Sequence, residues 1–266
     1  MIRGAVLGSP VTHSLSPRLH KAAFEFLGIQ GEYDAIDLDV NQLQDFFSTK
    51  GNDFDYFSLT MPLKEAVCTL DVNVHSLPAL INSGNTLLKN GTSWDLMSTD
   101  GSGFLKALNH AHVIASESTL ILGAGGTARA IAQSLNGVSK NIDVLARSSS
   151  RREAIETIID SSRCEFKSWN SDINFADYSL IVNTTPAGAA DLLSERITMR
   201  EDATFFDVIY KPWPTVLARK WSDMGGRVIN GLELLIYQGI DQLSLLLKQE
   251  LNYEEISQHL RKALAS

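Results

Sequence analysis

The chain has 266 residues, of which 44% are hydrophobic and 20% charged, and its formal net charge is −8. This length suits two globular domains, and the negative charge argues against general nucleic-acid binding, because a phosphate backbone would be repelled. The N-terminal residues lack the long apolar stretch of a signal peptide, and no apolar run approaches the roughly 18 residues of a membrane span. We therefore expect a cytoplasmic protein with no membrane or nucleic-acid partner.

The first hundred residues predict alternating strands and helices. We expect strands at 4–7, 33–38 and 54–60, and helices at 17–27, 41–49 and 63–70. The first helix has sharp boundary signals, because Ser16 suits the N-cap, Pro17 the first helical position and Gly28 the position after the last turn. This part of the chain is therefore predicted to be α/β.

Residues 118–130, STLILGAGGTARA, predict a buried strand that runs directly into a glycine turn and a helix. Gly123 and Gly125 permit a tight turn and let backbone N–H groups approach a pyrophosphate, and the following helix N-terminus favours that anion. Ala128 takes the last position of the GxGxxG pattern, a tolerated variant. The alternative is an ordinary tight connection. The candidate cofactor-binding residues of this segment are Gly123, Ala124, Gly125, Gly126, Thr127 and Ala128.

The alternation restarts here and is typical of a doubly wound sheet. Beyond the strand at 119–122 and a helix to Leu135, we expect strands at 142–146, 180–183, 204–209 and 227–229, and a helix at 151–159. A long helical stretch, 232–251, and an amphipathic helix, 254–265, close the chain. We expect these last helices to return to the first domain.

The residues after the second strand of this region predict the choice of cofactor. Arg147, Ser148 and Arg151 offer two guanidinium groups and a hydroxyl to the 2′-phosphate of NADP, where an acidic side chain would favour NAD. A solvated cluster at a helix start is the alternative for the arginines. Asp143 lies early in the strand and is interpreted as structural. NADP is therefore the predicted cofactor, and Cys68 and Cys164 are expected to be reduced thiols without a metal.

Polar groups follow apolar elements at several further points of the chain. In order, these motifs are SLSPRLH (14–20), SLTMPLK (58–64), SGNTLL (83–88), STDGSGF (98–104), GAGGTARA, ARSSSR (146–151), NTTPAG (183–188) and GLELLIYQ (231–238). The series resembles the shikimate dehydrogenase family along nearly the whole chain. The resemblance implies a substrate domain (1–102), a Rossmann-type NADP-binding domain (103–231) and C-terminal helices (232–266) that return to the first domain, with catalysis in a cleft.

The implied reaction is the reversible NADPH-dependent reduction of 3-dehydroshikimate to shikimate, on the route to chorismate and the aromatic amino acids, by a monomer or homodimer without a metal. A ketone that accepts hydride needs a proton donor or a positive charge beside its oxygen. By resemblance, Lys64 is the catalytic lysine and Asp100 the carboxylate that pairs with it. From the residues alone, a solvated lysine and a turn-forming aspartate remain alternatives.

The resemblance also assigns binding residues, chiefly hydroxyl and amide groups suited to a polyol. For the substrate these are Ser14, Ser16, Ser58, Thr60, Asn85, Tyr210 and Gln238. For the cofactor they include Asn183, Thr184 and Gly231. The polar residues of the first domain and Gln238 also fit caps, strands, turns or a helix surface.

Three positions depart from the common family pattern, since Lys21, Ser58 and Ser98 stand where asparagine is usual. Ser58 is the most consequential, because it is a shorter donor and acceptor than asparagine. A quinate or related polyol dehydrogenase is therefore an alternative. A non-catalytic sensor of NADP or shikimate is an alternative of another class, against which Lys64 and Asp100 argue.

Overall fold

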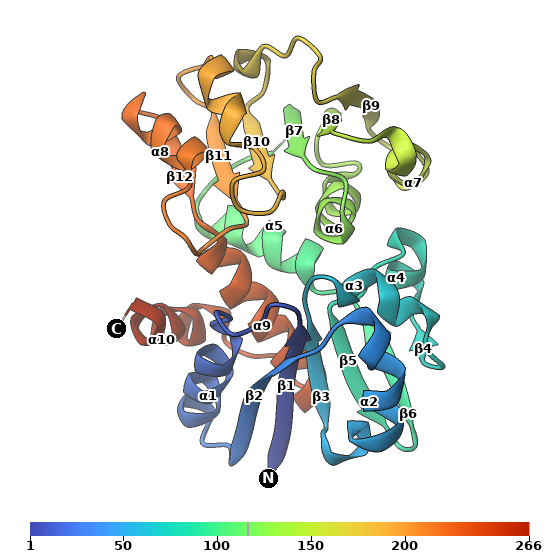
Figure 1. Cartoon of the computed structure of the whole chain (residues 1–266). Helices are drawn as coiled ribbons and strands as arrows, with labels where there is room; N and C mark the ends of the chain where they lie inside the picture. Colours follow the sequence, from blue (N-terminus) through green and yellow to red (C-terminus); the bar gives the residue numbers. More distant parts are fainter. Residues whose placement is uncertain (116, 266) are drawn as a thin grey trace. The chain divides into compact units, whose positions relative to one another are not determined.

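The structure, a computed structural model, describes residues 1–115 and 117–265. The chain forms two compact units: unit 1 comprises residues 1–103 and the chain from Leu235 onward, and unit 2 comprises Phe104–Leu234. The chain leaves unit 1 within helix α5 (Asp100–His110) and returns within helix α9 (Gly231–Leu247) (Figure 1). Unit 1 is thus built from both ends of the chain.

Unit 1 contains a six-stranded sheet of mixed direction, in the order β2-β1-β3-β5-β6-β4. The central strand pairs are parallel, β1 with β2 and β3, whereas β5 is antiparallel to both β3 and β6. The strands are β1 (Ile2–Gly8), β2 (Gly31–Asp37), β3 (Tyr56–Leu59), β4 (Asn73–Val74), β5 (Thr86–Asn90) and β6 (Ser93–Met97). The helices are α1 (Ser16–Leu27), α2 (Leu43–Thr49), α3 (Leu63–Ala66), α4 (Ser76–Ile81), α9 and α10 (Tyr253–Ala265).

The two faces of this sheet carry different residues, because side chains alternate along a strand. One face is apolar and packs Leu7, Phe57 and Leu59 against Leu43 and Phe46 of the α2 region. The other face carries polar and aromatic side chains from β2, β3 and β5, and it meets α1 and α9. Helix α10 packs beside α1 (Figure 1). The candidate site residues of unit 1 belong to this second face and its strand ends.

Helix α1 begins one residue earlier than the sequence signals predict. Leu15 is the N-cap with φ −87° and ψ −3°, so Ser16 is already the first helical residue and the prediction of Ser16 as N-cap is wrong. The reason is local: Leu15 already has helical backbone angles, and its carbonyl accepts from Leu19 N. Gly28, with φ 66°, ends the helix as predicted.

Unit 2 contains a parallel six-stranded sheet in the order β12-β11-β10-β7-β8-β9. This order reverses between β7 and β10, which is the doubly wound Rossmann arrangement and confirms the predicted fold class. Its strands are β7 (Ser118–Leu122), β8 (Asn141–Ala146), β9 (Arg163–Ser168), β10 (Leu180–Asn183), β11 (Thr204–Asp207) and β12 (Arg227–Ile229). Its helices are the main part of α5, then α6 (Gly126–Leu135), α7 (Arg152–Glu156) and α8 (Val216–Asp223).

Several predicted boundaries in the second half of the chain are wrong by a few residues, for local reasons. Strand β11 ends at Asp207, because its side chain accepts from Ile209 N and turns the backbone. Helix α9 ends at Leu247, where Lys248 adopts φ 52°. Helix α7 begins one residue later than predicted, because a 3-10 turn capped by Ser148 precedes it, and it ends three residues early, at Glu156. Over residues 1–115 and 117–265, we find no helix with the length and apolar character needed to cross a membrane.

Candidate active site

Lys64 and Asp100 form an ion pair in unit 1. Lys64 lies on α3, just after β3 ends, and Asp100 is the first residue of α5. Lys64 Nζ is 2.6 Å from Asp100 Oδ2, and the two side chains are only 18% and 6% exposed. The other carboxylate oxygen, Oδ1, accepts from Asn85 Nδ2 at 2.9 Å. Because both oxygens are engaged, the carboxylate is held in one orientation beside the ammonium group.

Buried amide and hydroxyl groups continue from this pair and form what we call the amide cluster: Asn85, Thr86, Thr99, Gln238 and Gln242. Asn85 Nδ2 is 3.1 Å from Gln238 Oε1, and Gln242 Nε2 donates to the same oxygen at 2.9 Å. Gln238 and Gln242 are four residues apart on α9, so their amides share one face of the helix. The amide cluster therefore ties α9 to the start of β5 beside the ion pair.

Backbone groups determine which way each amide of the cluster is turned. Thr99 N donates to Asn85 Oδ1 at 2.8 Å, and Gln238 Nε2 donates to Leu235 O at 3.1 Å. Gln242 Nε2 lies 3.3 Å from Asn85 O. A backbone N–H only donates and a backbone carbonyl only accepts, so turning any of these amides over would lose a hydrogen bond. The donors and acceptors of the amide cluster are therefore fixed.

The other candidate substrate residues of unit 1 follow the carboxyl ends of β1 and β3, which are parallel neighbours. Ser14 Oγ accepts from Ser16 N at 3.2 Å where α1 begins. Thr60 comes directly after β3, and its methyl group lies beside Gly8, where an added Cβ would be 2.3 Å away. Ser58, on β3, donates to Gln242 Oε1 at 2.6 Å. Strand ends of this kind are where ligand sites of α/β folds form.

The glycine turn of unit 2 has the geometry that a dinucleotide site requires. Gly123 has φ +104°, and a Cβ there would lie 2.7 Å from Thr184 Oγ1, so only glycine fits. Gly125 has φ −76°, and a Cβ there would meet only Arg151 Nη1, at 3.5 Å. The turn leads directly into α6, whose first N–H groups are an anion-binding end.

Two arginines contact the carbonyl of Ala124 at the centre of this turn. Arg129, which is 2% exposed, donates from Nη1 at 3.1 Å. Arg151 donates to the same oxygen at 3.4 Å. Arg147 and Ser148 follow the end of β8 and are exposed, and the Ser148 hydroxyl accepts from Ser150 N. The arginines predicted to bind a 2′-phosphate thus lie at the carboxyl end of the second Rossmann strand.

The remaining candidate residues of unit 2 lie at or just after the ends of β10, β11 and β12. Asn183 Nδ2 donates to the buried carboxylate of Asp207 at 3.1 Å, and Asn183 Oδ1 accepts from both the backbone and the hydroxyl of Thr185. Burial raises the pKa of Asp207, although hydrogen bonds from Thr215, Ile209 and Asn183 oppose that rise. Tyr210 follows on the next loop. Gly231 packs against the Val208 carbonyl, which would be 2.1 Å from a Cβ.

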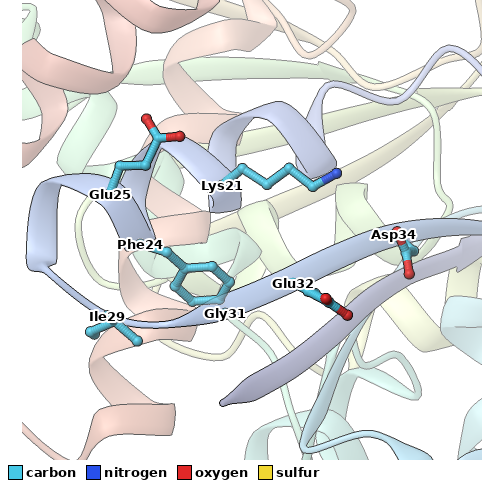
Figure 2. Close-up of a pocket in the computed structure, with 7 residues that line it drawn as sticks. All are labelled: Lys21, Phe24, Glu25, Ile29, Gly31, Glu32 and Asp34. Atoms are coloured by element: carbon cyan, nitrogen blue, oxygen red, sulfur yellow. The ribbon is translucent and has the colours of Figure 1, made fainter.

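A pocket of about 450 Å³ lies elsewhere, between α1 and the start of β2 (Figure 2). Its lining residues are Lys21, Phe24, Glu25, Ile29, Gly31, Glu32 and Asp34. Three of these are carboxylates, and none belongs to the candidate site. We therefore assign this pocket no part in the site, although it contains Lys21, one of the departures from the family pattern.

Known proteins of one family match this chain. A family model described as the shikimate dehydrogenase substrate binding domain matches residues 6–87. The chain is 31% identical over 262 residues to the shikimate dehydrogenase (NADP(+)) of Staphylococcus aureus strain MSSA476, covering 91% of each chain. The chain belongs to the shikimate dehydrogenase family. This confirms the resemblance seen in the sequence motifs.

Solved structures of family members have the same fold over nearly the whole chain. The shikimate dehydrogenase of Mycobacterium tuberculosis superposes with a TM-score of 0.87 at 30% identity, covering 98% of this chain and 100% of that one. A shikimate 5-dehydrogenase from Thermus thermophilus, solved in complex with NADP(H) and shikimate, gives a TM-score of 0.81 at 30% identity and covers 99% and 100%.

Sequence motifs did not identify several buried residues that join the candidate residues of this family member. Gln242 is one; its spacing of four from Gln238 on an otherwise apolar helix face was the available signal. In unit 2, Arg129 supports the glycine turn and Asp207 holds Asn183. The sequence around Tyr33 contains no comparable pattern, because only the folded structure places its hydroxyl beside Ser58.

Proposed function

We propose that this chain is a shikimate dehydrogenase that catalyses the reversible NADPH-dependent reduction of 3-dehydroshikimate to shikimate. The observation that carries the proposal is the 2.6 Å contact between Lys64 Nζ and Asp100 Oδ2, mostly shielded from solvent and continuous with the amide cluster. This contact supports a role in proton transfer. An ammonium group that is shielded from solvent and held in one place can give a proton to the substrate oxygen as negative charge develops there.

In the direction of reduction, Lys64 donates a proton to the ketone oxygen as the carbonyl carbon gains a hydride, so C=O becomes CH–OH. In the reverse direction, the Lys64 amine removes the hydroxyl proton. Asp100 keeps the lysine in place, since its second oxygen is anchored by Asn85. Lys64 regains or releases its proton through solvent, which reaches the 18% of its side chain that is exposed.

The hydroxyl and amide groups of unit 1 suit a ring that carries a carboxylate and three hydroxyls. We assign the carboxylate to Ser14 and Ser16, and the ring hydroxyls to Ser58, Thr60, Asn85 and Gln238, with Tyr210 as a further contact. Hydroxyl and amide side chains are suited to hydrogen bonds with a carboxylate and with ring hydroxyls. The crystal structure of the Thermus relative with shikimate and NADP(H) supports this substrate class.

The cofactor is NADP, and the residues of unit 2 fit it. Gly125 leaves room at the N-terminus of α6 for a pyrophosphate. We assign Arg147, Ser148 and Arg151, which follow the end of β8, to the 2′-phosphate. Asn183, Thr184 and Gly231 are assigned to the ribose and nicotinamide. When bound, NADPH supplies the hydride.

We place the reaction in the cytoplasm, on the route to chorismate and the aromatic amino acids. The free thiols of Cys68 and Cys164 support a reducing compartment. The family name of the relatives supports the pathway.

The direct test mixes the purified full chain with 3-dehydroshikimate and either NADPH or NADH, and follows loss of reduced-nicotinamide absorbance. We expect turnover with NADPH, weaker turnover with NADH, and shikimate as the product. A second series compares oxidation of shikimate with that of quinate, because serine at position 58 makes the preference between them informative. Thermal stabilisation by shikimate or NADP without any turnover would instead favour a sensor.

A further inference from the structure

A second set of buried polar contacts links Ser58 to strand β2, on the side away from Asp100. Ser58 Oγ accepts from the Tyr33 hydroxyl at 2.5 Å, in addition to its bond to Gln242. Tyr33 is fully buried and Ser58 is 4% exposed. A continuous chain of hydrogen bonds therefore runs from Tyr33 through Ser58 to Gln242, a member of the amide cluster.

The direction of every bond in this chain follows from the orientation of Gln242. Its Nε2 faces the carbonyl of Asn85, so its Oε1 faces Ser58. A carbonyl oxygen only accepts, so the single proton of Ser58 goes to Gln242. Ser58 can then only accept from Tyr33, whose phenol must donate. Burial raises the pKa of Tyr33, so the phenol keeps this proton.

The position of the phenol is set by the sheet and by α1. Gly4 pairs with Tyr33 on one side and with Tyr56 on the other. A Cβ on Gly4 would lie 2.3 Å from Tyr56 Cε1 and 2.8 Å from Tyr33 Cδ2, so both rings pack over the bare glycine. His20 stacks on the Tyr33 ring, with centroids 4.0 Å apart and planes 8° from parallel. These contacts with Gly4 and His20 hold the Tyr33 ring, and with it the hydroxyl, beside Ser58.

We propose that Tyr33 is a positioning residue for substrate binding, which holds the Ser58 hydroxyl in place beside Gln242, whose own amide is fixed by the Asn85 carbonyl. The inference rests on the proposed function, which assigns Ser58 to a ring hydroxyl. Because the proton of Ser58 is already donated to Gln242, Ser58 offers the substrate a lone pair and no proton. It therefore selects a substrate group that donates a hydrogen bond, such as a hydroxyl.

The test compares Tyr33→Phe with Tyr56→Phe in the full chain. The two tyrosines lie on the same face of the sheet and are both fully buried, but the Tyr56 hydroxyl contacts His20 Nδ1, at 2.9 Å. Each variant loses one buried phenol hydrogen bond, so both should lower the melting temperature. Only Tyr33→Phe should raise KM for shikimate. The expected increase is about five- to tenfold, the change in affinity that corresponds to the loss of one hydrogen bond. Its kcat should stay within about twofold of wild type.

A double-mutant cycle shows whether Tyr33 acts through Ser58. Ser58→Ala should raise KM for shikimate, and adding Tyr33→Phe to it should cause no further increase, because the partner of the phenol is already gone. If Tyr33→Phe folds poorly, KM for shikimate in Ser58→Ala still tests whether the Ser58 hydroxyl contributes to substrate binding. Equal effects of Tyr33→Phe on KM with and without the Ser58 hydroxyl would overturn the inference, as would equal KM values for Tyr33→Phe and Tyr56→Phe. Both KM comparisons require a wild-type enzyme that turns over shikimate. If the wild type shows no turnover, the proposed function is contradicted and not this inference.

Discussion

Asn85 donates its side-chain N–H to Oδ1 of Asp100 across 2.9 Å, which leaves Oδ2 of the same carboxylate facing Lys64. Asp100 cannot turn away from Lys64 without losing its bond to Asn85. The amide of Asn85 is itself held by Thr99 N. The ion pair on which the proposed chemistry depends is therefore oriented before any substrate arrives, which lowers the cost of reaching the reactive geometry.

Replacing Lys64 by methionine should abolish most of the activity and leave the fold intact. Methionine keeps an unbranched side chain and removes the ammonium group. We expect kcat to fall by roughly 10²- to 10⁴-fold in both directions, the usual contribution of a general acid or base, while calorimetry still detects shikimate binding. Lys50→Met, at the exposed C-cap of α2, is the control and should keep full activity. Wild-type turnover in Lys64→Met would remove the basis of the mechanism.

The preference for NADP should depend on Arg147 and Arg151 and not on their neighbour Arg152. Charge-assisted hydrogen bonds to a phosphate are worth about 1.5–3 kcal/mol each, so Arg147→Ala and Arg151→Ala should each raise KM for NADPH by about 10- to 100-fold. KM for NADH should barely change in Arg147→Ala and should rise less than KM for NADPH in Arg151→Ala, because Arg151 also donates to the Ala124 carbonyl of the glycine turn. Arg152 pairs with Glu156 and donates to Phe166 O. Arg152→Ala should therefore leave both constants unchanged. Steady-state kinetics with the two cofactors decides this, and a parallel loss for NADPH and NADH would argue against a 2′-phosphate contact.

Two glycines of the same turn should respond differently to an added methyl group. Gly123→Ala places a Cβ at φ +104° and 2.7 Å from Thr184 Oγ1, so it should destabilise unit 2 by about 2–5 kcal/mol. Gly125→Ala has an ordinary φ and open space, so its unfolding free energy should change by less than about 1 kcal/mol. Its KM for NADPH should nevertheless rise, because the methyl occupies the approach to α6. Denaturant unfolding measures the effect on stability, and cofactor kinetics measure the effect on KM. An unchanged KM for NADPH in Gly125→Ala would exclude binding of the cofactor pyrophosphate at the N-terminus of α6.

Acid should destabilise unit 1 through His20. Burial lowers the pKa of His20 to about 3 from its ordinary 6.5, so between these values the unfolded chain binds a proton that the folded chain does not. The unfolding free energy should therefore rise with pH from about 3 to 6.5 and then level off, with a slope of at most about 1.4 kcal/mol per pH unit from this group.

Urea unfolding at several pH values, for wild type and His20→Asn, tests this dependence. The asparagine amide can still meet the Tyr56 hydroxyl, and the variant should show a shallower slope below pH 6.5 although its stability at pH 7 is lower. His13→Asn, at an exposed histidine, should keep the wild-type slope. An identical slope in His20→Asn would mean that other groups cause the acid sensitivity.

The glycine turn and its flanking elements were predictable because their signals are local. The apolar run of β7 ends where Gly123 must adopt a positive φ, and the helix formers of α6 follow at once. Strand β9 was missed because it is an edge strand in which only Phe166 is buried, so its sequence lacks the apolar pattern of a central strand. Helix α8 was also missed; it has no strong boundary residue apart from Thr215, whose hydroxyl caps it.

The candidate site divides in the same way. Lys64, Asp100 and Asn85 stand in motifs that can be seen in the sequence, and the fold places them in hydrogen-bond contact. For Gln242 the sequence offers only its spacing of four from Gln238, and its contact with Ser58 spans 184 positions of the chain. Tyr33 could not be assigned from the sequence, because its role depends on a contact with Ser58, 25 positions away. Such contacts are properties of the fold and leave no pattern of their own in one sequence.

Because unit 1 is assembled from the first hundred residues and the last thirty or so, its polar interior cannot be completed early in protein synthesis. While the ribosome is still translating unit 2, Ser58 and Asn85 lack the glutamines of α9 and must stay hydrated. Unit 2, in contrast, is one continuous segment that can fold as it emerges. The nascent chain should therefore acquire a cofactor-binding lobe before it has anywhere to hold a substrate.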